Sequence, residues 1–297
     1  MNYVCTVFRS DMVIRTEWLG LLGPQQAGYG WPMTTESDGR GVLAVEDHDG
    51  VRVLTLDRPD ALNAFNDDLY DAVRKAMQDA AEQPDVAVVV ITGRGRAFSA
   101  GQDLGDLAKA PRHDDGQPHG FYPFIETVED FPKPLLAAVN GIAVGIGLTL
   151  LPHCDLVLVS ETARLRAPFV SLGVTAEAGS TYLLPAMIGW QATAQLFYTA
   201  EWLDADRAVE LGLALRKVPA DGLMDETLAL ATKIAAMPIP SLVGTKRLLL
   251  DARLAAVREA RRHEDDTFAR LVGGPANREA LAAFRERREP DFTQLDE

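Results

Sequence analysis

The sequence predicts an α/β fold followed by an all-helical C-terminal region. Three patterns predict it: a hairpin signal near residue 50, short β-branched runs that lead into a glycine turn and then a helix, and an almost wholly helical pattern after about residue 180. A hairpin and single strands that alternate with helices favour an α/β core, or alternatively an α+β core, with short parallel crossovers. The 297 residues are enough to bury a large core.

The first elements are a hairpin, a helix and a buried strand. Residues 42–57 contain two β-branched runs separated by an Asp-Gly turn signal, which predicts a β-hairpin. Asn66 is a helix-capping residue, and the apolar residues that follow it recur at helical spacing as far as Pro84. The continuously apolar run at 86–92 predicts a strand that is buried on both faces.

The next predicted elements are again strands followed by glycine turns, and the predicted elements after them are helices. Two more apolar runs, at 135–139 and 155–160, predict strands, and a glycine turn follows the first of them. Asp204 is expected to cap a helix that continues through Leu211. Long amphipathic patterns then predict helices at 223–236, 241–272 and 276–288.

The charge of the chain narrows its possible partners. Acidic residues outnumber basic ones by 43 to 29, so the formal net charge is −14. A negative field repels a phosphate backbone, and we therefore expect no nucleic-acid partner. A small anion can still bind where backbone N–H groups or a local basic cluster supply positive potential.

The cysteines, the histidines and the length of the apolar runs argue against a disulfide-rich protein, a metal-binding protein and a membrane protein. Cys5 and Cys154 are the only cysteines and lie far apart, which argues against a disulfide framework and a zinc site. The five histidines lack paired-ligand spacing, so we expect no metal. No apolar run reaches the length of a membrane span, since the most apolar stretch contains Asn140. We expect a cytoplasmic protein that does not enter a membrane.

Residues 1–40 are interpreted as an N-terminal extension. The first 32 residues lack both a clear period and the basic and apolar regions of a signal peptide. One interpretation is that translation starts at Met33. An N-terminal peptide from natively expressed protein that begins before Met33 would contradict it.

Two glycine-rich turns follow predicted strands. The stretches Gly93–Leu107 and Asn140–Leu150 each run from a strand through glycines to a helix start. Free backbone N–H groups at such turns can stabilise an oxyanion, and two turns could converge on one carbonyl oxygen. A plain turn is the alternative interpretation of each stretch.

Glu177 is the one charged residue in the apolar stretch Ala167–Leu184. Burial among apolar groups raises the pKa of a carboxyl, which suits a proton carrier near neutral pH. The alternative is a solvated acid near a helix N-terminus, where the helix dipole favours it and it has no chemical role.

Four ordered segments resemble the enoyl-CoA hydratase/isomerase, or crotonase, superfamily. The resemblance covers about residues 41–290 and rests on LDRPDALNAFN (56–66), AFSAGQDL (97–104), AAVNGIAVGIGLTLLPHCDLVLVS (137–160) and LDADRAVELGLALRKV (203–218). It implies a ββα spiral core at 41–235 that binds coenzyme A thioesters and catalyses their reaction. It also implies a helical region at 236–297 that drives assembly into homotrimers or dimers of trimers.

The resemblance also implies a site. The backbone N–H groups of Gln102 and Ile146 would form an oxyanion hole for the thioester carbonyl. Arg58 is a candidate phosphate contact, although a solvated turn residue is an equal alternative. Thr149 and Phe169 would line the acyl pocket, and simple packing in the core is the favoured alternative for both. The remaining positions expected beside coenzyme A are Ala61, Leu62, Ala100, Gly101, Asp103 and Leu104.

Within the superfamily, the motif positions favour an isomerase. Thr149 and Phe169 occupy the places of the two glutamates of typical hydratases, and neither side chain transfers protons as a carboxylate does. Glu177 occupies the place of the acid in peroxisomal-type Δ3,Δ2-enoyl-CoA isomerases. The resemblance therefore implies an enzyme that moves the double bond of a 3-enoyl-CoA to the 2-position, with coenzyme A as part of the substrate and no other cofactor.

Three alternatives remain open at this stage. The first is a hydratase, or another lyase, in which Glu177 works with a bound water. The second is an isomerase of ring-oxidised aromatic acyl-CoA. The third is a non-catalytic acyl-CoA-binding subunit.

Overall fold

The structure, a computed structural model, describes residues 41–103, 105 and 116–295. Three positions singled out from the sequence, namely the 1–40 extension, Cys5 and Leu104, lie outside the described residues. The described residues belong to a single compact unit.

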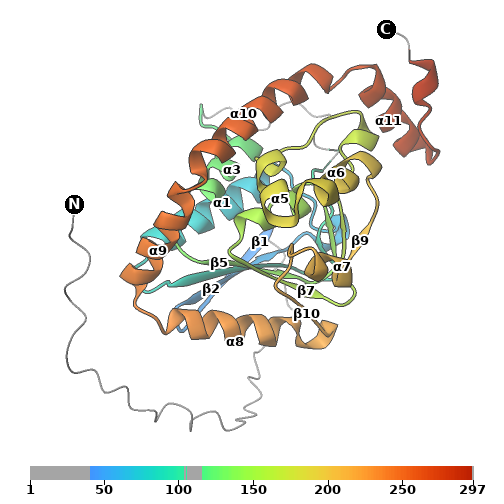
Figure 1. Cartoon of the computed structure of the whole chain (residues 1–297). Helices are drawn as coiled ribbons and strands as arrows, with labels where there is room; N and C mark the ends of the chain where they lie inside the picture. Colours follow the sequence, from blue (N-terminus) through green and yellow to red (C-terminus); the bar gives the residue numbers. More distant parts are fainter. Residues whose placement is uncertain (1–40, 104, 106–115, 296–297) are drawn as a thin grey trace, which may run out of the picture. The chain divides into compact units, whose positions relative to one another are not determined.

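A six-stranded sheet forms the centre of this unit (Figure 1). Its first two strands pair antiparallel, with Leu43 opposite Leu56, and this confirms the predicted hairpin. All the other pairings in the sheet are parallel. The strands lie in the order β1 (Leu43–His48), β2 (Val51–Leu56), β3 (Val88–Gly93), β5 (Leu135–Val139), β7 (Leu156–Ser160) and β10 (Arg216–Val218).

A smaller sheet takes one short strand from each turn of the chain. Its strands are β4 (Ala97–Ser99), β6 (Ile142–Val144), β8 (Arg164–Arg166) and β9 (Leu203–Asp204). β4, β6 and β8 each follow a strand of the large sheet and pair in parallel. The chain therefore repeats a strand, strand, helix unit, which is the ββα spiral expected from the sequence.

Helices cover both faces of the large sheet (Figure 1). Helix α1 (Asp67–Glu82) packs against β1 and β2, and α8 (Leu223–Ala235) packs across β2, β3, β5 and β7. Asn66 caps α1 as predicted, since its Oδ1 accepts from the Leu69 N–H at 3.1 Å. β3 and β5 are buried along their whole length because of this cover.

The remaining helices include α3 (Phe121–Glu129), which packs on α1, and a group at the C-terminal end of the chain. The α-helices are α3, α4 (Ile146–Thr149), α5 (Ser180–Ile188), α6 (Trp190–Thr199), α7 (Ala205–Glu210), α9 (Ile239–Asp251), α10 (Leu254–Leu271) and α11 (Pro275–Glu286). The short 3-10 helices are η2 (Pro59–Ala61), η3 (Leu151–His153), η4 (Val170–Leu172), η5 (Ala220–Gly222) and η6 (Phe292–Gln294). The predicted cap at Asp204 is confirmed by its bond from the Arg207 N–H at 2.9 Å.

One predicted helix is wrong in its extent. The pattern at 241–272 predicts a single helix, but the structure has two, α9 and α10, with a break at residues 252–253. Leu250 and Leu254 are both buried on either side of the break, and the Arg253 guanidinium donates to the Pro152 carbonyl at 3.2 Å. Docking onto the body of the protein therefore decides where the first helix ends, and the helical period does not reveal this.

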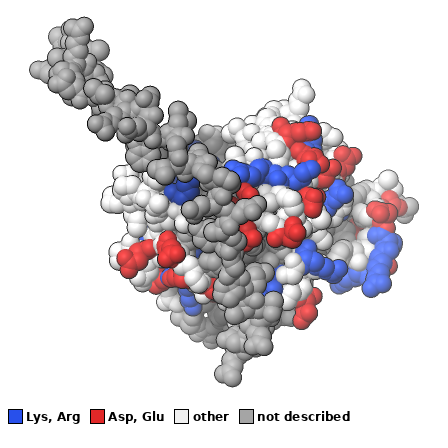
Figure 2. Space-filling view, turned by 90° about the horizontal axis from the view of Figure 1, so that it is seen from below, with Lys and Arg blue, Asp and Glu red and all other residues white. Residues whose placement is uncertain are grey.

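The surface and the helices give two further observations. On the face seen in Figure 2, acidic and basic side chains lie interspersed, separated by uncharged residues. Within the described ranges, no single helix is long and apolar enough to cross a membrane. The segments Ala220–Ala235 and Ile239–Asp251 satisfy that test of length and composition only as a pair, and the pair is bent by 104°.

Candidate functional site

The first glycine turn leaves a backbone donor free at Gln102. Phe65 forms a parallel bridge with Gln102: its N–H donates to Gly101 O at 2.7 Å, and its carbonyl accepts from Asp103 N at 2.8 Å. In a parallel bridge, the residue between the two bonded residues, here Gln102, directs its own N–H away from the partner segment at Phe65. Among the described residues the Gln102 N–H has no acceptor.

The second glycine turn leaves a donor free at Ile146. Gly145 has φ +54° and precedes α4, so Ile146 is the first residue of that helix. Leu148 and Thr149 both donate their N–H groups to the Gly145 carbonyl at 2.9 Å. The first N–H groups of a helix have no partner inside it. The Ile146 N–H finds none elsewhere in the described ranges.

The two turns touch each other. A Cβ atom added to Gly101, which has φ +96°, would lie 2.9 Å from the Val144 carbonyl oxygen, and one added to Gly145 would lie 3.7 Å from the Gly101 Cα. A Cβ on Gly147 would lie 2.7 Å from the Ser99 carbonyl oxygen. Only glycine allows this approach of the backbones. Two free N–H donors therefore lie on neighbouring turns, as an oxyanion-binding site requires.

Glu177 lies in the loop between η4 and α5. The residue keeps some accessible surface, yet its carboxyl is set deep enough that burial raises its pKa from 4.5 to about 8. The negative charges of Glu264 and then Asp265 are the smaller causes of the same shift. No described residue donates a hydrogen bond to the Glu177 carboxyl. The shift has the direction expected from the apolar sequence around Glu177, and the carboxyl is free to meet a ligand.

The backbone after Glu177 is held on two sides. Ala178 has the left-handed φ of +63°, which a residue with a Cβ rarely adopts. His153 Nε2 donates to the Ala178 carbonyl at 2.8 Å, and the Glu264 carboxylate accepts from the Gly179 N–H at 2.7 Å. Sequence reasoning missed both His153 and Glu264. Glu264 lies in a helix rich in charged residues, where no local pattern distinguishes it from its exposed neighbours.

Tyr70 anchors the Gln102 side chain in the first glycine turn. Its hydroxyl donates to Gln102 Oε1 at 2.8 Å. Burial raises the pKa of Tyr70 well above 10, and the charge of Glu177 adds to that shift. The Glu177 carboxyl is therefore within electrostatic reach of the side chain that anchors Gln102.

The structure gathers most of the residues expected beside coenzyme A. The Leu62 carbonyl accepts from the Ala100 N–H at 2.9 Å, so the segments that carry them are joined. Arg58 Nη2 donates to Asp103 Oδ2 at 3.0 Å, and its Nη1 donates to the Ala64 carbonyl. Arg58 thus ties the two segments together inside the protein. The side chains of Ala61, Leu62 and Ala100 are partly exposed.

Thr149 and Phe169 are core residues. Thr149 is fully buried, and its hydroxyl donates to the Gly145 carbonyl at 3.2 Å. Phe169 packs edge to face on Phe197, with ring centroids 6.2 Å apart. Thr149 therefore supports the second glycine turn, and neither residue places a proton-transferring group in the site.

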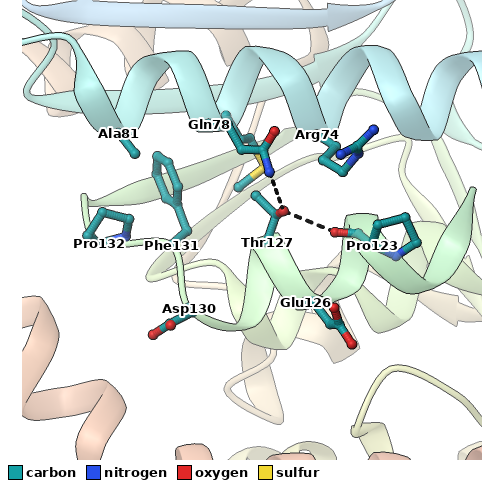
Figure 3. Close-up of a pocket in the computed structure, with 10 residues that line it drawn as sticks. Arg74, Gln78, Ala81, Pro123, Glu126, Thr127, Asp130, Phe131 and Pro132 are labelled. Carbon is teal, nitrogen blue, oxygen red and sulfur yellow. Dashed lines mark hydrogen bonds between the residues drawn. The ribbon is translucent and has the colours of Figure 1, made fainter. Parts of the chain in front are cut away.

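A cavity of about 380 Å³ lies elsewhere, between α1 and α3 (Figure 3). In its wall Gln78 Nε2 donates to Thr127 Oγ1 at 3.5 Å, and Thr127 Oγ1 donates to the Pro123 carbonyl at 3.0 Å. None of the site residues expected from the sequence lines it. It is therefore separate from the Glu177 site. In the part of the chain that the structure describes, no group of three or more His, Cys, Asp or Glu side chains is placed to hold a metal ion.

Comparisons with known proteins find similar chains and similar structures. Residues 46–295 match the family model described as enoyl-CoA hydratase/isomerase. Two Escherichia coli (strain K12) proteins are each 33% identical: 2,3-dehydroadipyl-CoA hydratase, over 84% of this chain and 98% of the relative, and 1,2-epoxyphenylacetyl-CoA isomerase, over 82% and 95%. A crystal structure of an enoyl-CoA hydratase/isomerase from Pseudoalteromonas atlantica T6c superposes with a TM-score of 0.81 at 33% identity, covering 85% of this chain and all of the other.

Proposed function

The chain belongs to the enoyl-CoA hydratase/isomerase family, or crotonase superfamily, and we propose that it moves the double bond of a 3-enoyl-CoA to the 2-position. Membership of the family makes it an acyl-CoA enzyme of the hydratase/isomerase type. The observation that carries the finer proposal is the Glu177 carboxyl: no described residue donates a hydrogen bond to it, and its pKa of about 8 lies near neutral pH.

The two glycine turns supply the electrostatic part of the reaction. The thioester carbonyl oxygen would accept hydrogen bonds from the N–H groups of Gln102 and Ile146. As the proton leaves C2, negative charge moves onto this oxygen, and fixed N–H donors stabilise it without reorganising. Both donors belong to the backbone, so the side chains at these positions can vary without loss of the site.

Glu177 supplies the proton transfer. Its carboxylate takes a proton from C2, the electron pair moves through C1 to the carbonyl oxygen, and a dienolate forms. The protonated Glu177 then returns the proton at C4, so that the C3–C4 double bond becomes a C2–C3 double bond. A carboxyl with a pKa of about 8 is suited to both halves, because it releases and accepts a proton near neutral pH.

The lack of an acid at the two positions that typical hydratases fill with glutamates supports isomerisation over hydration. The positions of the two hydratase glutamates hold Thr149 and Phe169, and the Thr149 hydroxyl is already bonded to the Gly145 carbonyl. One carboxyl that reaches both carbons is enough for a proton shift. Hydration by two glutamates requires a second acid, which neither of these residues supplies.

The remaining features of the proposal concern binding and assembly. Coenzyme A would lie along Ala61, Leu62 and Ala100, with no further cofactor needed and with a cytoplasmic location. Exposed apolar side chains on the C-terminal helices, among them Leu248 at 73% and Phe284 at 65% exposure, support assembly into trimers or dimers of trimers through residues 236–297.

A second candidate is isomerisation of a ring-oxidised aromatic acyl-CoA. The relative described as 1,2-epoxyphenylacetyl-CoA isomerase, which is 33% identical, favours it. A single carboxyl beside an oxyanion-binding site serves this reaction as well.

One experiment separates these activities. The protein is incubated with 3-hexenoyl-CoA, 2-hexenoyl-CoA or 1,2-epoxyphenylacetyl-CoA, and double-bond movement, water addition and ring rearrangement are followed. The proposal predicts conversion of 3-hexenoyl-CoA, reduced by a factor of roughly 10² to 10⁴ in Glu177→Gln, as expected for a lost general base. Glu201→Gln, an exposed residue on the surface, is the matched control and should keep full activity.

The other outcomes are equally informative. Water addition to 2-hexenoyl-CoA without conversion of 3-hexenoyl-CoA would reject the isomerase in favour of a hydratase. Turnover of the epoxide alone would select the second candidate. Binding of coenzyme A esters without any turnover would indicate a non-catalytic subunit.

A further inference from the structure

A buried carboxylate from the C-terminal helices reaches the N-terminus of α5, next to Glu177. Glu264 on α10 is 4% exposed. Its oxygens accept from the Gly179 N–H at 2.7 Å, the Thr181 N–H at 2.8 Å and the Thr181 hydroxyl at 2.6 Å. Glu264 therefore binds the backbone that follows Glu177, from 85 residues further along the chain.

The close approach of α10 to this backbone depends on Gly179. A Cβ atom at Gly179 would lie 2.7 Å from Val257 Cγ1 on α10. α10 is also tied to α3 by the pair between Arg261 and Glu129, at 2.8 Å, in which the Glu129 side chain is fully buried. α10 is thus held firmly enough to place Glu264 in a fixed position.

The contacts of Glu264 suit a negative charge. The pKa of Glu264 is raised above 4.5, mainly by burial and further by the charge of Asp265, and its three hydrogen bonds oppose that rise. All three donors point at carboxylate oxygens, and a carboxylate is the form that accepts without donating. The ionised form is therefore the one that this geometry fits, and its charge also raises the pKa of Glu177.

Other groups around Glu177 do not cancel this charge. Asp265 on α10 acts in the same direction as Glu264. Tyr70 on α1 and Tyr122 on α3 both feel the charge of Glu177 and are neutral near pH 7, because their pKa values are raised above 10. Burial lowers the pKa of His153 to about 4, so the imidazole that binds the Ala178 carbonyl is neutral as well.

We propose that Glu264 is a positioning residue for Glu177: it fixes the turn that presents the Glu177 carboxyl, and its buried negative charge favours the protonated form of that carboxyl. This inference rests on the proposed function of Glu177 as the proton carrier. A carrier that must return its proton at C4 gains from a neighbour that disfavours early loss of that proton. Glu264 itself need not touch the substrate, because it acts through Gly179 and Thr181.

The test replaces the charge while keeping the size of the side chain. Glu264→Gln removes the negative charge, and Glu264→Asp keeps the charge but shortens the reach to the α5 backbone. The titration of Glu177 is followed by carboxyl ¹³C NMR of the full chain labelled in glutamate, with Glu177→Gln identifying the resonance. The kcat and KM for 3-hexenoyl-CoA are measured on the same samples.

The two variants should separate the two roles. In Glu264→Gln the midpoint of the Glu177 titration should fall by about one pH unit, since a like charge has been removed. The kcat should fall about tenfold or more while KM stays within about threefold of the original, because an interaction expressed in the reaction step is lost. Glu264→Asp should leave the midpoint near its original value and lower kcat.

Two further variants complete the test. Asp265→Asn removes the smaller of the two neighbouring charges, which is not bonded to the α5 backbone, so it should move the midpoint less and lower kcat less than Glu264→Gln. Thr181→Val removes only the hydroxyl that donates to Glu264. This milder variant tests the proposal if Glu264→Gln does not fold. It should lower kcat several-fold at constant KM, and an unchanged kcat would contradict the proposal.

The outcomes also separate this inference from the proposed function. A folded Glu264→Gln protein whose Glu177 midpoint is unmoved overturns the inference, even if its melting temperature falls. A moved midpoint in a protein that does not convert 3-hexenoyl-CoA supports the coupling and rejects the isomerase, since the NMR titration needs no substrate.

Discussion

The two glycine turns and the Glu177 loop position reactive groups in different ways. The turns present backbone N–H groups and are held by contacts between short segments, such as Gly101 against Val144. The Glu177 loop presents a side chain and is held by His153 and by Glu264, a residue 85 positions from its partner Gly179. The position of the backbone donors therefore depends on glycines, which have no Cβ. The position and pKa of the Glu177 carboxyl depend on burial and on charged residues that are far away in the sequence.

The largest expected effect comes from filling the contact between the turns. Gly101→Ala places a Cβ 2.9 Å from the Val144 carbonyl oxygen at a φ of +96°. We expect kcat/KM for 3-hexenoyl-CoA to fall by roughly 10² to 10³, as when one oxyanion donor is lost. Gly95→Ala, at a φ of +78° in an exposed turn, is the matched control for backbone strain. Equal losses in both variants would show that strain alone is responsible.

The next largest effect is expected on the free energy of unfolding, which the buried Glu177 carboxyl lowers at high pH. Folding raises the pKa of this carboxyl from 4.5 to about 8. The unfolded chain therefore binds fewer protons than the folded protein between these pH values, and the free energy of unfolding falls as the pH rises through that window. The Glu177→Gln variant has no carboxyl at this position and does not lose stability in this way as the pH rises. Its free energy of unfolding should therefore exceed that of the original protein by about 1 to 3 kcal/mol at pH 8.5.

Urea unfolding at pH 5 and pH 8.5 measures this difference. The gain should be small at pH 5, where the carboxyl is protonated in the folded protein. A gain that does not grow with pH would show that Glu177 is ionised freely in the folded state.

A somewhat smaller effect is expected at His153. His153→Ala leaves the Ala178 carbonyl without its donor and should cost about 1 to 3 kcal/mol at pH 7. Because burial lowers the pKa of His153 from 6.5 to about 4, the original protein should lose stability as the pH falls through that window. Denaturant curves at pH 7 and pH 4.5 should show this loss in the original protein and a weaker one in His153→Ala. Parallel losses would assign the acid sensitivity to other groups.

The smallest effect is expected on the outer face of the same helix that carries Glu264. Arg262 and Glu259 form an exposed pair at 2.7 Å on α10. Exposed pairs contribute little because water and salt screen them. Arg262→Ala should therefore change neither the melting temperature nor the Glu177 midpoint measurably. A clear shift of the midpoint would show that net charge on α10, rather than the position of Glu264, controls Glu177.

The same contrast explains what the sequence could predict. Features set by neighbouring residues were predicted correctly, such as the hairpin at 42–57, the Asn66 cap and the buried strands. The glycine turns were recognised because strand, glycine and helix follow one another within a few residues. Glu177 was recognised because no other charge lies near it in the sequence.

The features that were missed arise from contacts between distant segments. Glu264 looks like any other acid of a charged amphipathic helix, and only the docking of α10 on Gly179 buries it. The break between α9 and α10 depends on the contact of Arg253 with the Pro152 carbonyl. Neither contact leaves a periodic or local signal, since each joins segments more than 70 residues apart.

The pH dependence of kcat/KM for 3-hexenoyl-CoA tests the central claim most directly, because it reports the ionisation of the base in the free enzyme. If Glu177 is that base, kcat/KM should rise with pH and level off above about pH 8, the pKa that burial and neighbouring acids give this carboxyl. This rise should be absent from the residual activity of Glu177→Gln. A rise centred near pH 4.5, or one that Glu177→Gln retains, would contradict the account.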